Sequence, residues 1–331
     1  MGSDRGHTQT GDLPHLPDLP HLHDLPGGPL MSKSLGDRAR GSARNLLRVS
    51  PLSVQRRVLG AMDKHSAWDS GVPPVAPLVP VSMTTGSPDF VGVGVPKCGT
   101  TWWFSLIMSH PDIHVENEKE LQFFNIHFLR LLDAGKITEA DVETYRQWFP
   151  RPAGSITGEW TPHYAFAHQL PPVLRVAAPG AKLLFMLRDP VERYRSDVSR
   201  KTSSKRLDLL RYRAMFNGLY SDVLKPWEQA YAPQEMLVLQ FEACLAAPDE
   251  LLAQTFRFLG VDDSYRPPQI RTPVNKTQSK RGLDRDIEVM LDRLYVPSVL
   301  DLAARYPEID LSLWPNFAHL VDRPGFPAPP A

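Results

Sequence analysis

The sequence predicts an α/β fold of three layers, in which helices flank a central parallel sheet. Three short apolar runs carry this prediction, each with the length and composition of a buried strand. They are residues 90–95 (FVGVGV), 182–187 (KLLFML) and 236–241 (MLVLQF). A segment with helical periodicity follows each run, and this alternation favours a doubly wound parallel sheet. Ligands of such sheets bind beyond the carboxyl ends of the strands, so the residues after the three runs form the candidate site.

Helices are expected after the first and the third strand. The first helix should cover about residues 101–109, where His110-Pro111 stops it. The other should cover about residues 248–259 and end at Gly260, the residue type that most often terminates a helix in the left-handed conformation.

The helix after the second strand has a clear start signal. Asp189 is the expected N-cap, Pro190 takes the first helical position and Glu192 completes a capping box. Arg188 stands directly before this cap, at the carboxyl end of the strand. An arginine at that place favours anion binding, and the alternative is a salt bridge between Arg188 and Asp189 that only caps the helix.

Proline divides the chain into three parts. The 331 residues include 33 prolines, which are enriched at both ends of the chain. Residues 13–26 (LPHLPDLPHLHDLP) repeat a Leu-Pro-x triplet that is incompatible with helix or sheet hydrogen bonding. We therefore predict a flexible Pro-rich segment over 1–88, one folded domain over 89–316 and a Pro-rich tail over 317–331.

Composition excludes several classes of protein. Lys and Arg total 37, as do Asp and Glu, and this zero net charge argues against a general nucleic-acid or anionic-membrane binder. Two cysteines, Cys98 and Cys244, are too few for a disulfide scaffold or a Cys-based zinc site. No apolar stretch approaches the roughly 18 residues of a membrane span, and the first ten residues lack the apolar core of a secretory signal. We expect a cytoplasmic protein without a transmembrane segment.

The loop after the first strand has the composition of an anion site. It reads Pro96-Lys97-Cys98-Gly99-Thr100-Thr101 and leads into a helix N-terminus, whose N–H groups and dipole attract anions. Lys97 adds a positive charge and Gly99 lets a ligand approach the backbone. The nucleotide-binding pattern G-x-x-x-x-G-K-[ST] does not fit, because Lys97 precedes Gly99, and the dinucleotide pattern lacks its third glycine. An ordinary tight turn with a surface lysine is the alternative.

Together with later motifs, this loop resembles that of sulfotransferases that use 3′-phosphoadenosine-5′-phosphosulfate (PAPS). Residues 96–102 (PKCGTTW) are similar to their 5′-phosphosulfate loop, and Arg188 with Ser196 eight residues later is similar to their 3′-phosphate motif. The branch that the chain most resembles is the heparan-sulfate-type and bacterial carbohydrate sulfotransferases. That likeness rests on ELQFFN (120–125), GEWTPHY (158–164) and GLY (218–220) followed by Trp227, and covers about residues 89–315.

The resemblance implies a P-loop-like version of the three-layer fold and a defined reaction. A sulfuryl group would pass in line from PAPS to an acceptor hydroxyl or amine on a carbohydrate, glycolipid or small natural product. Adenosine 3′,5′-bisphosphate would be the other product, and no metal would take part. Lys97 would serve the leaving oxygen. Glu120 would be the general base, with Phe123 and Phe124 as an apolar wall that raises its pKa, although a surface acid is the alternative reading.

The resemblance also implies two sets of binding residues. The cofactor contacts are Lys97, Cys98, Gly99, Thr100, Thr101, Trp102, Arg188, Ser196, Lys276, Thr277, Lys280 and Arg281. The acceptor contacts are Glu159, Trp160, His163 and Tyr164. Two positions depart from the branch: Trp160 replaces a lysine, and residues 271–282 lack the aromatic pair that stacks on adenine. Loop cations in solvent and core packing are the alternatives for the weaker members of these sets. For Cys98 we favour packing, although a helix N-terminus is able to lower a thiol pKa.

Two other functions stay open from the sequence. One is a P-loop-like kinase or NTPase, which would require magnesium; the strand-end aspartate that holds it is missing, because Asp189 follows Arg188. The other is a non-catalytic nucleotide-binding module. The expected partner is a small-molecule or glycan acceptor rather than a nucleic acid. The sequence indicates neither the acceptor, nor O- versus N-sulfation, nor the oligomeric state.

Overall fold

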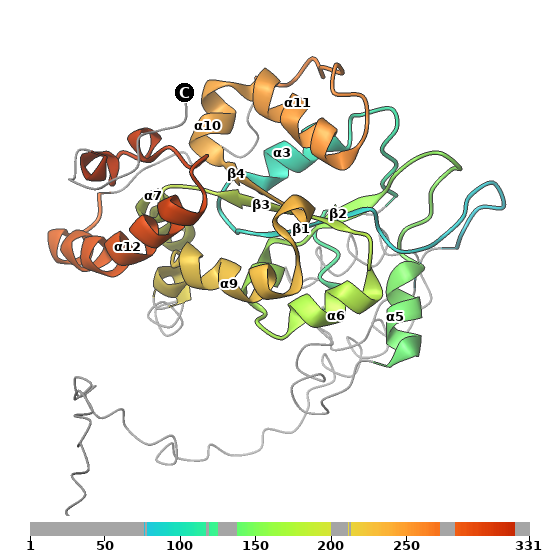
Figure 1. The fold of residues 1–331 in the computed structure, drawn as a ribbon, viewed down its shortest axis with the longest axis horizontal. Helices are drawn as coiled ribbons and strands as arrows, with labels where there is room; N and C mark the ends of the chain where they lie inside the picture. The colour runs from blue at the N-terminus through green and yellow to red at the C-terminus, as the bar shows by residue number, and fades with distance from the viewer. Residues whose placement is uncertain are drawn as a thin grey trace, which may run out of the picture. The chain divides into compact units, whose positions relative to one another are not determined.

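A four-stranded parallel sheet forms the centre of the fold (Figure 1). The computed structural model describes residues 76, 78–116, 119–124, 138–199, 211, 213–271 and 282–321. All of them belong to the larger of the two units into which the chain divides, Leu46–Ala331. The Leu-Pro-x repeat lies outside the described residues, so its predicted conformation stays a prediction.

The strands lie in the order β2-β1-β3-β4. Their bounds are β1 (Phe90–Gly94), β2 (Gly158–Trp160), β3 (Lys182–Leu187) and β4 (Met236–Gln240). The three predicted strands are therefore confirmed to within one residue, and each is largely apolar because helices cover both faces of the sheet. Strand β2 was not predicted, since three residues with a glutamate at their centre give no hydrophobic period.

Helices form a layer on each face of the sheet, which confirms the α/β fold of three layers. Figure 1 shows α3, α10 and α11 over one face and α5, α6 and α9 over the other, with α12 packed along α9 and α7. The α-helices are α3 (Thr100–Ile107), α5 (Glu139–Arg146), α6 (Leu170–Ala177), α7 (Pro190–Val198), α9 (Tyr220–Ala230), α10 (Phe241–Ala246), α11 (Pro248–Leu259) and α12 (Arg285–Arg305). Short 3-10 turns are η2 (Pro162–Phe166), η3 (Pro233–Glu235), η4 (Leu311–Leu313) and η5 (Ala318–Leu320).

Two of the three predicted helix ends are confirmed in detail. Helix α11 ends at Leu259, and Gly260 follows it with φ of +87°. Asp189 is the N-cap of α7, where its Oδ1 accepts the N–H groups of Val191 and Glu192 at 2.9 and 3.2 Å.

The predicted capping box at α7 is wrong. In a capping box the Glu192 carboxylate would accept the N–H of Asp189. That N–H instead donates to Oε1 of Glu242, which lies at the start of α10, at a distance of 3.1 Å. The Glu192 carboxylate faces Arg195 at 2.6 Å and Arg188 at 3.8 Å. The Glu192 carboxylate therefore pairs with arginines instead of capping the helix. The N–H of Asp189 is satisfied by Glu242, a residue distant in sequence.

Aromatic packing seats helix α3 against the sheet. The Trp160 indole lies over Gly92, where an added Cβ would stand 2.1 Å from the ring, so β1 needs a glycine there. Trp160 Nε1 donates to the Gly94 carbonyl at 3.2 Å, and its ring meets Phe104 of α3 edge-on at 6.3 Å. On the opposite side of α3, Trp103 Nε1 donates to Thr255 Oγ1 of α11 at 3.1 Å. These contacts fix where the N-terminus of α3 lies.

Packed structure extends past both limits predicted for the folded domain. Before residue 89, Thr84 pairs with Arg151 through two backbone hydrogen bonds, and Ser87 Oγ donates to the Ala177 carbonyl at 3.1 Å. After residue 316, Phe317 and Leu320 are completely buried in the core. Leucine and phenylalanine between prolines read as a tail in sequence, yet here they complete the core.

Candidate active site

The loop between β1 and α3 lies at the carboxyl ends of the central strands and has a tightly constrained backbone. Gly99 has φ of +86°, and an added Cβ would stand 2.4 Å from the Phe241 ring. Lys97 also has positive φ, 73°. Thr100 begins α3, so the first N–H groups of the helix and its positive dipole end face this loop. The predicted phosphosulfate loop therefore has the geometry of an anion cradle.

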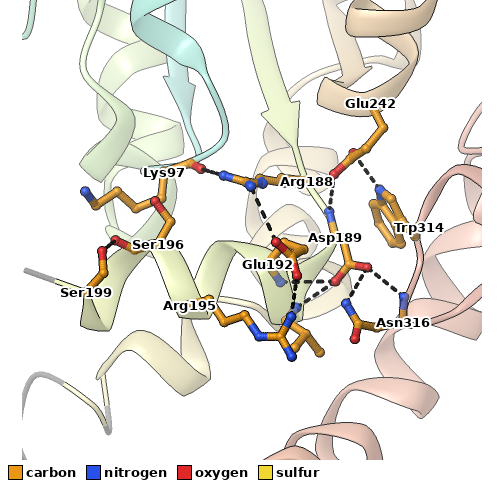
Figure 2. A network of polar contacts seen from close by, with 11 residues as sticks. Lys97, Arg188, Asp189, Glu192, Arg195, Ser196, Ser199, Glu242, Trp314 and Asn316 are labelled. Atoms are coloured by element: carbon orange, nitrogen blue, oxygen red, sulfur yellow. Dashed lines mark hydrogen bonds and ion pairs between the residues drawn. The ribbon is translucent and has the colours of Figure 1, made fainter. Parts of the chain in front are cut away.

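Arg188 lies directly against this loop, as Figure 2 shows. Its Nη1 donates to the Lys97 carbonyl at 3.3 Å, and its Cζ lies 5.2 Å from the centre of the Phe241 ring. Ser196 is half-buried on α7, at the same side of the network as Lys97 (Figure 2). The structure thus places Arg188 against the Lys97 carbonyl, and Ser196 on α7, the helix that begins directly after Arg188 and Asp189.

The proposed salt bridge between Arg188 and Asp189 does not form. Besides capping α7, the Asp189 carboxylate accepts from the backbone N–H and the side-chain amide of Asn316, at 3.0 and 2.9 Å. Arg188 instead has Glu192 Oε2 at 3.8 Å as its ionic neighbour. The alternative reading of Arg188 as half of a helix cap is therefore wrong, and the guanidinium stays on the loop side of the strand end.

Tyr220 contacts both the loop between β1 and α3 and the strand end that carries Arg188. Its hydroxyl donates to the Arg188 carbonyl at 2.8 Å and contacts Cys98 Sγ at 3.7 Å. Burial raises the pKa of the Cys98 thiol to about 12, against the smaller opposing effect of Arg193. Burial therefore outweighs the opposing charges, and Cys98 packs as a neutral thiol under the loop.

Glu120 is half-buried and lies beside two polar neighbours. Its Oε1 is 3.0 Å from Lys119 Nζ, and its Oε2 accepts from Gln122 Nε2 at 3.4 Å. Lys119 Nζ also donates to Thr100 Oγ1 at 3.3 Å, which links the predicted base to the first residue of α3. The carboxylate and the anion loop therefore belong to one site.

Phe123 and Phe124, predicted as an apolar wall beside Glu120, pack into the core. Phe123 and Phe124 are buried, and their rings pack against Tyr145 at centroid distances of 5.2 and 4.6 Å. They anchor the Glu120 segment to the core and so hold the carboxylate at the site edge, where its exposed fraction is 35%.

Backbone strain is concentrated in this site. Among the described residues, the non-glycine residues with positive φ are Lys97, Glu120 and Gln122, at 73°, 69° and 55°. Such conformations cost of order 1–3 kcal/mol each and tend to occur where function requires them. Both predicted catalytic residues are among the three, and the third contacts Glu120.

Three of the four predicted acceptor contacts belong to the core. Glu159, Trp160 and Tyr164 have exposed fractions of 1%, 0% and 0%. The Glu159 carboxylate accepts from the hydroxyls of Tyr145, Thr161 and Tyr164 at 2.8, 2.7 and 3.3 Å. These side chains offer no surface to an acceptor, because they hold β2 and η2 in place. Only His163 of the four is exposed.

The remaining predicted contacts divide between surface, core and undescribed chain. Thr101 is exposed on the first turn of α3, whereas Thr100 and Trp102 are 4% and 2% exposed. Lys276, Thr277, Lys280 and Arg281 lie outside the described residues. No group of three or more His, Cys, Asp or Glu side chains able to hold a metal occurs in the described part of the chain. Nor does any helix there combine the length and apolar character of a membrane crossing.

Sequence reasoning missed several residues of the site. Lys119 and Gln122 lie within two residues of Glu120, and Lys119 is the one cation in the acidic run 116–120, which was a usable signal. Glu242 follows the third predicted strand, which is the place where a site residue is expected. Trp314 and Asn316 gave no signal, because only the tertiary fold brings them to α10 and to the N-cap of α7.

The fold and the site define a class of protein. A three-layer α/β fold with an anion loop, a strand-end arginine and a strained carboxylate is built for group transfer from an anionic donor. Comparison with known families makes this specific: residues 87–281, more than half of the chain, match the model described as "Sulfotransferase domain". The chain belongs to the sulfotransferase family.

Individual relatives agree with this membership. Heparan sulfate glucosamine 3-O-sulfotransferase 3B1 of Mus musculus is 29% identical over 192 residues, which cover 53% of this chain and 46% of the relative. Heparan sulfate glucosamine 3-O-sulfotransferase 6 of Homo sapiens is 28% identical over 208 residues, covering 57% of each. The chain spans about half the length of the curated relatives it matches.

A solved structure supports the fold. A crystal structure of a sulfotransferase from Alicyclobacillus acidocaldarius aligns with a TM-score of 0.55 and 26% sequence identity. The alignment covers 69% of this chain and 99% of the other. The predicted resemblance to sulfotransferases is thereby confirmed.

Proposed function

We propose that the protein transfers a sulfuryl group from PAPS to an acceptor hydroxyl or amine. The observation that carries this proposal is the meeting of Lys97, Arg188 and Glu120 at one edge of the sheet. Arg188 touches the Lys97 carbonyl, and Lys119 links Glu120 to Thr100 of the same loop. Donor-binding and proton-accepting groups therefore belong to one network.

The loop and Arg188 divide the binding of the donor between them. The backbone N–H groups at the start of α3 and the Thr101 hydroxyl hold the 5′-phosphate, as anions bind at helix N-termini. Arg188 and Ser196 hold the 3′-phosphate, for which the planar guanidinium supplies paired donors. Burial of the Arg188 side chain, which is 18% exposed, strengthens that charge-assisted contact.

In the chemical step, one proton leaves the acceptor, one bond forms between the acceptor atom and sulfur, and one sulfur–oxygen bond breaks. Glu120 takes the proton of the acceptor group while the acceptor atom bonds to sulfur. Lys97 stabilises the electron pair left on the bridging oxygen as the sulfur–oxygen bond to the 5′-phosphate breaks. The products are the sulfated acceptor and adenosine 3′,5′-bisphosphate.

The acceptor that we propose is a carbohydrate, a glycolipid or a small natural product with an accessible hydroxyl. Support for a carbohydrate comes from the names of the relatives, which act on heparan sulfate glucosamine. His163 is the exposed side chain of the η2 turn that is able to contact such an acceptor.

The test is transfer of labelled sulfate from PAPS to a panel of sugars, glycolipids and hydroxylated metabolites. Glu120→Gln should lower turnover by about 100- to 10,000-fold with little change in adenosine 3′,5′-bisphosphate affinity. Glu143→Gln is the matched control, because Glu143 is exposed on α5 at 3.9 Å from Arg146. Full turnover by the Glu120→Gln protein would overturn the role of Glu120. Binding of adenosine 3′,5′-bisphosphate with no transfer to any acceptor would favour a non-catalytic module, and a strict magnesium requirement would favour a kinase or NTPase.

A further inference from the structure

Lys119 stands between the two halves of the proposed active site. Its ammonium donates to Thr100 Oγ1 at 3.3 Å and to Glu120 Oε1 at 3.0 Å. Thr100 is the first residue of α3, in the donor loop, and Glu120 is the proposed base. One cation therefore contacts both the group that holds the donor and the group that deprotonates the acceptor.

The setting of Lys119 is unusual for a lysine. Its side chain is 14% exposed, whereas lysine ammonium groups ordinarily stay in water. Burial lowers the pKa of Lys119, and the neighbouring Glu120 carboxylate opposes that change. A charge held in this way interacts more strongly with a second charge than it would in solvent.

The contact with Thr100 also has a direction. The ammonium has donors only, so the Thr100 hydroxyl accepts from Lys119 and turns its own proton elsewhere. An anion bound by that hydroxyl lies next to the Lys119 ammonium. A 5′-phosphosulfate bound in the loop would therefore have its negative charge beside the Lys119 ammonium.

We propose that Lys119 is a second catalytic cation, which binds the transferring sulfuryl oxygens and orients the Glu120 carboxylate. This assignment rests on the proposed sulfuryl transfer. As the acceptor oxygen bonds to sulfur and the bond to the 5′-phosphate breaks, Lys119 keeps its proton and stabilises the negative charge on the sulfuryl oxygens. The acceptor proton goes to Glu120 and the leaving electron pair goes to the phosphate oxygen, beside Lys97.

Lys97 and Lys119 would stabilise charge on opposite sides of the transferring sulfuryl group. Lys97 lies in the loop that carries the leaving oxygen, and Lys119 lies on the Glu120 side, from which the acceptor attacks. Trp160 is unable to supply charge at this place, because its indole is buried over Gly92 and donates to the Gly94 carbonyl. Lys119 is the lysine whose ammonium the structure links to Glu120.

The experiment compares Lys119→Met and Lys119→Arg with the wild-type protein. With PAPS and an acceptor identified in the panel, Lys119→Met should lower kcat about 100-fold, the loss typical of one transition-state donor. The Kd for adenosine 3′,5′-bisphosphate, which lacks the sulfuryl group, should change less than about five-fold. Lys119→Arg should recover part of kcat, because it restores the charge.

The comparison of kcat with affinity separates catalysis from packing. A purely structural lysine would act by building the donor loop, so its loss would weaken adenosine 3′,5′-bisphosphate binding together with kcat. The matched control is Lys225→Met, which removes a lysine paired with Asp222 at 3.0 Å on the surface of α9 and should leave both kcat and the Kd unchanged.

Each outcome decides a different claim. Unchanged kcat in Lys119→Met would overturn the assignment of Lys119 and leave the sulfotransferase proposal intact. A parallel loss of kcat and of adenosine 3′,5′-bisphosphate affinity would also overturn it, because Lys119 would then serve only to build the loop. Absence of transfer by the wild-type protein across the panel would overturn the proposed function, and the role of Lys119 with it.

Discussion

The carboxylate of Glu242 accepts the backbone N–H of Asp189 at 3.1 Å and so ties the start of α10 to the corner that carries Arg188. Its second oxygen accepts from Trp314 Nε1 at 2.9 Å, while Asn316 holds the Asp189 carboxylate (Figure 2). The segment after α12 thus packs against the corner that carries Arg188 and Asp189. Arg188 is held in place from behind by residues that lie far from it in sequence.

This network predicts a pH-dependent stability. Burial raises the pKa of Glu242 to about 7 and also raises that of Asp189. The folded state therefore binds these protons more tightly than the unfolded state, and stability should fall as the pH rises from about 4.5 to 7. Glu242→Gln removes one ionisation, so urea midpoints measured between pH 5 and 8 should fall less steeply in this variant.

The control for the pH series is Glu143→Gln, on the exposed surface of α5. Its midpoints should follow the wild-type slope, because Glu143 is 59% exposed and 3.9 Å from its cation. Identical slopes for wild type and Glu242→Gln would show that the Glu242 proton does not contribute to folding.

A second prediction concerns the charge and shape of Arg188. Arg188→Met should weaken binding of adenosine 3′,5′-bisphosphate by about 100-fold, because a charge-assisted pair of hydrogen bonds is lost. Arg188→Lys should lose about ten-fold, since an ammonium keeps the charge without the planar fork. Isothermal titration calorimetry measures both. Arg257→Met, which removes a 69% exposed arginine paired with Asp263, should bind as the wild type does; equal affinity for Arg188→Lys would argue against a bidentate contact.

A third prediction tests the structural role of Glu159. Tyr145→Phe removes the hydroxyl that donates to the buried Glu159 carboxylate at 2.8 Å, and should lower the free energy of unfolding by about 1–3 kcal/mol. Turnover per folded molecule should stay unchanged, because this cluster supports β2 rather than the acceptor. Tyr306→Phe removes a similar bond to Glu228 at 2.7 Å in a half-buried place and should cost less. Loss of turnover without loss of stability in Tyr145→Phe would return Glu159 to the acceptor site.

The parts of the fold that sequence reasoning found are those with a local cause. Strands β1, β3 and β4 are continuous apolar runs because both faces of the sheet are covered. Gly260 and Asp189 terminate and begin their helices through contacts within a few residues. In each case the signal and its physical cause lie in the same short segment.

The parts that it missed have distant causes. Glu192 fits a capping box by spacing, but Glu242 from the next strand end takes the N–H of Asp189. Glu159 looks like a site acid, yet a tyrosine from α5 meets it in the core. The grouping of Lys97, Arg188 and Glu120 needed both strand order and a family resemblance, because spacing alone did not separate Glu120 from its acidic neighbours.

A fourth prediction follows from the buried thiols. Cys98 and Cys244 are completely buried; burial raises the pKa of Cys98 to about 12 and also raises that of Cys244. Since the thiolate is the reactive form, both should resist a disulfide exchange reagent at pH 8 and react together in denaturant. Rapid modification of Cys98 in the native protein would show that the anion loop opens.

The last prediction separates the two demands on Gly99. Gly99→Ala should lower the free energy of unfolding by about 2–3 kcal/mol. Of this loss, about 1 kcal/mol comes from placing alanine in the left-handed conformation, and the rest from the close contact of its Cβ with Phe241. Gly154→Ala is a matched control, because Gly154 has the same φ of +86° and no atom within 4 Å of an added Cβ. It should lose only the backbone part and bind adenosine 3′,5′-bisphosphate normally. In a double-mutant cycle measured by urea unfolding, adding Phe241→Leu to Gly99→Ala should recover about 1 kcal/mol of the lost unfolding free energy, because the smaller side chain makes room for the methyl group. Equal losses in the two alanine variants would mean that the loop moves away from Phe241 without cost, and that its conformation is not set by this contact.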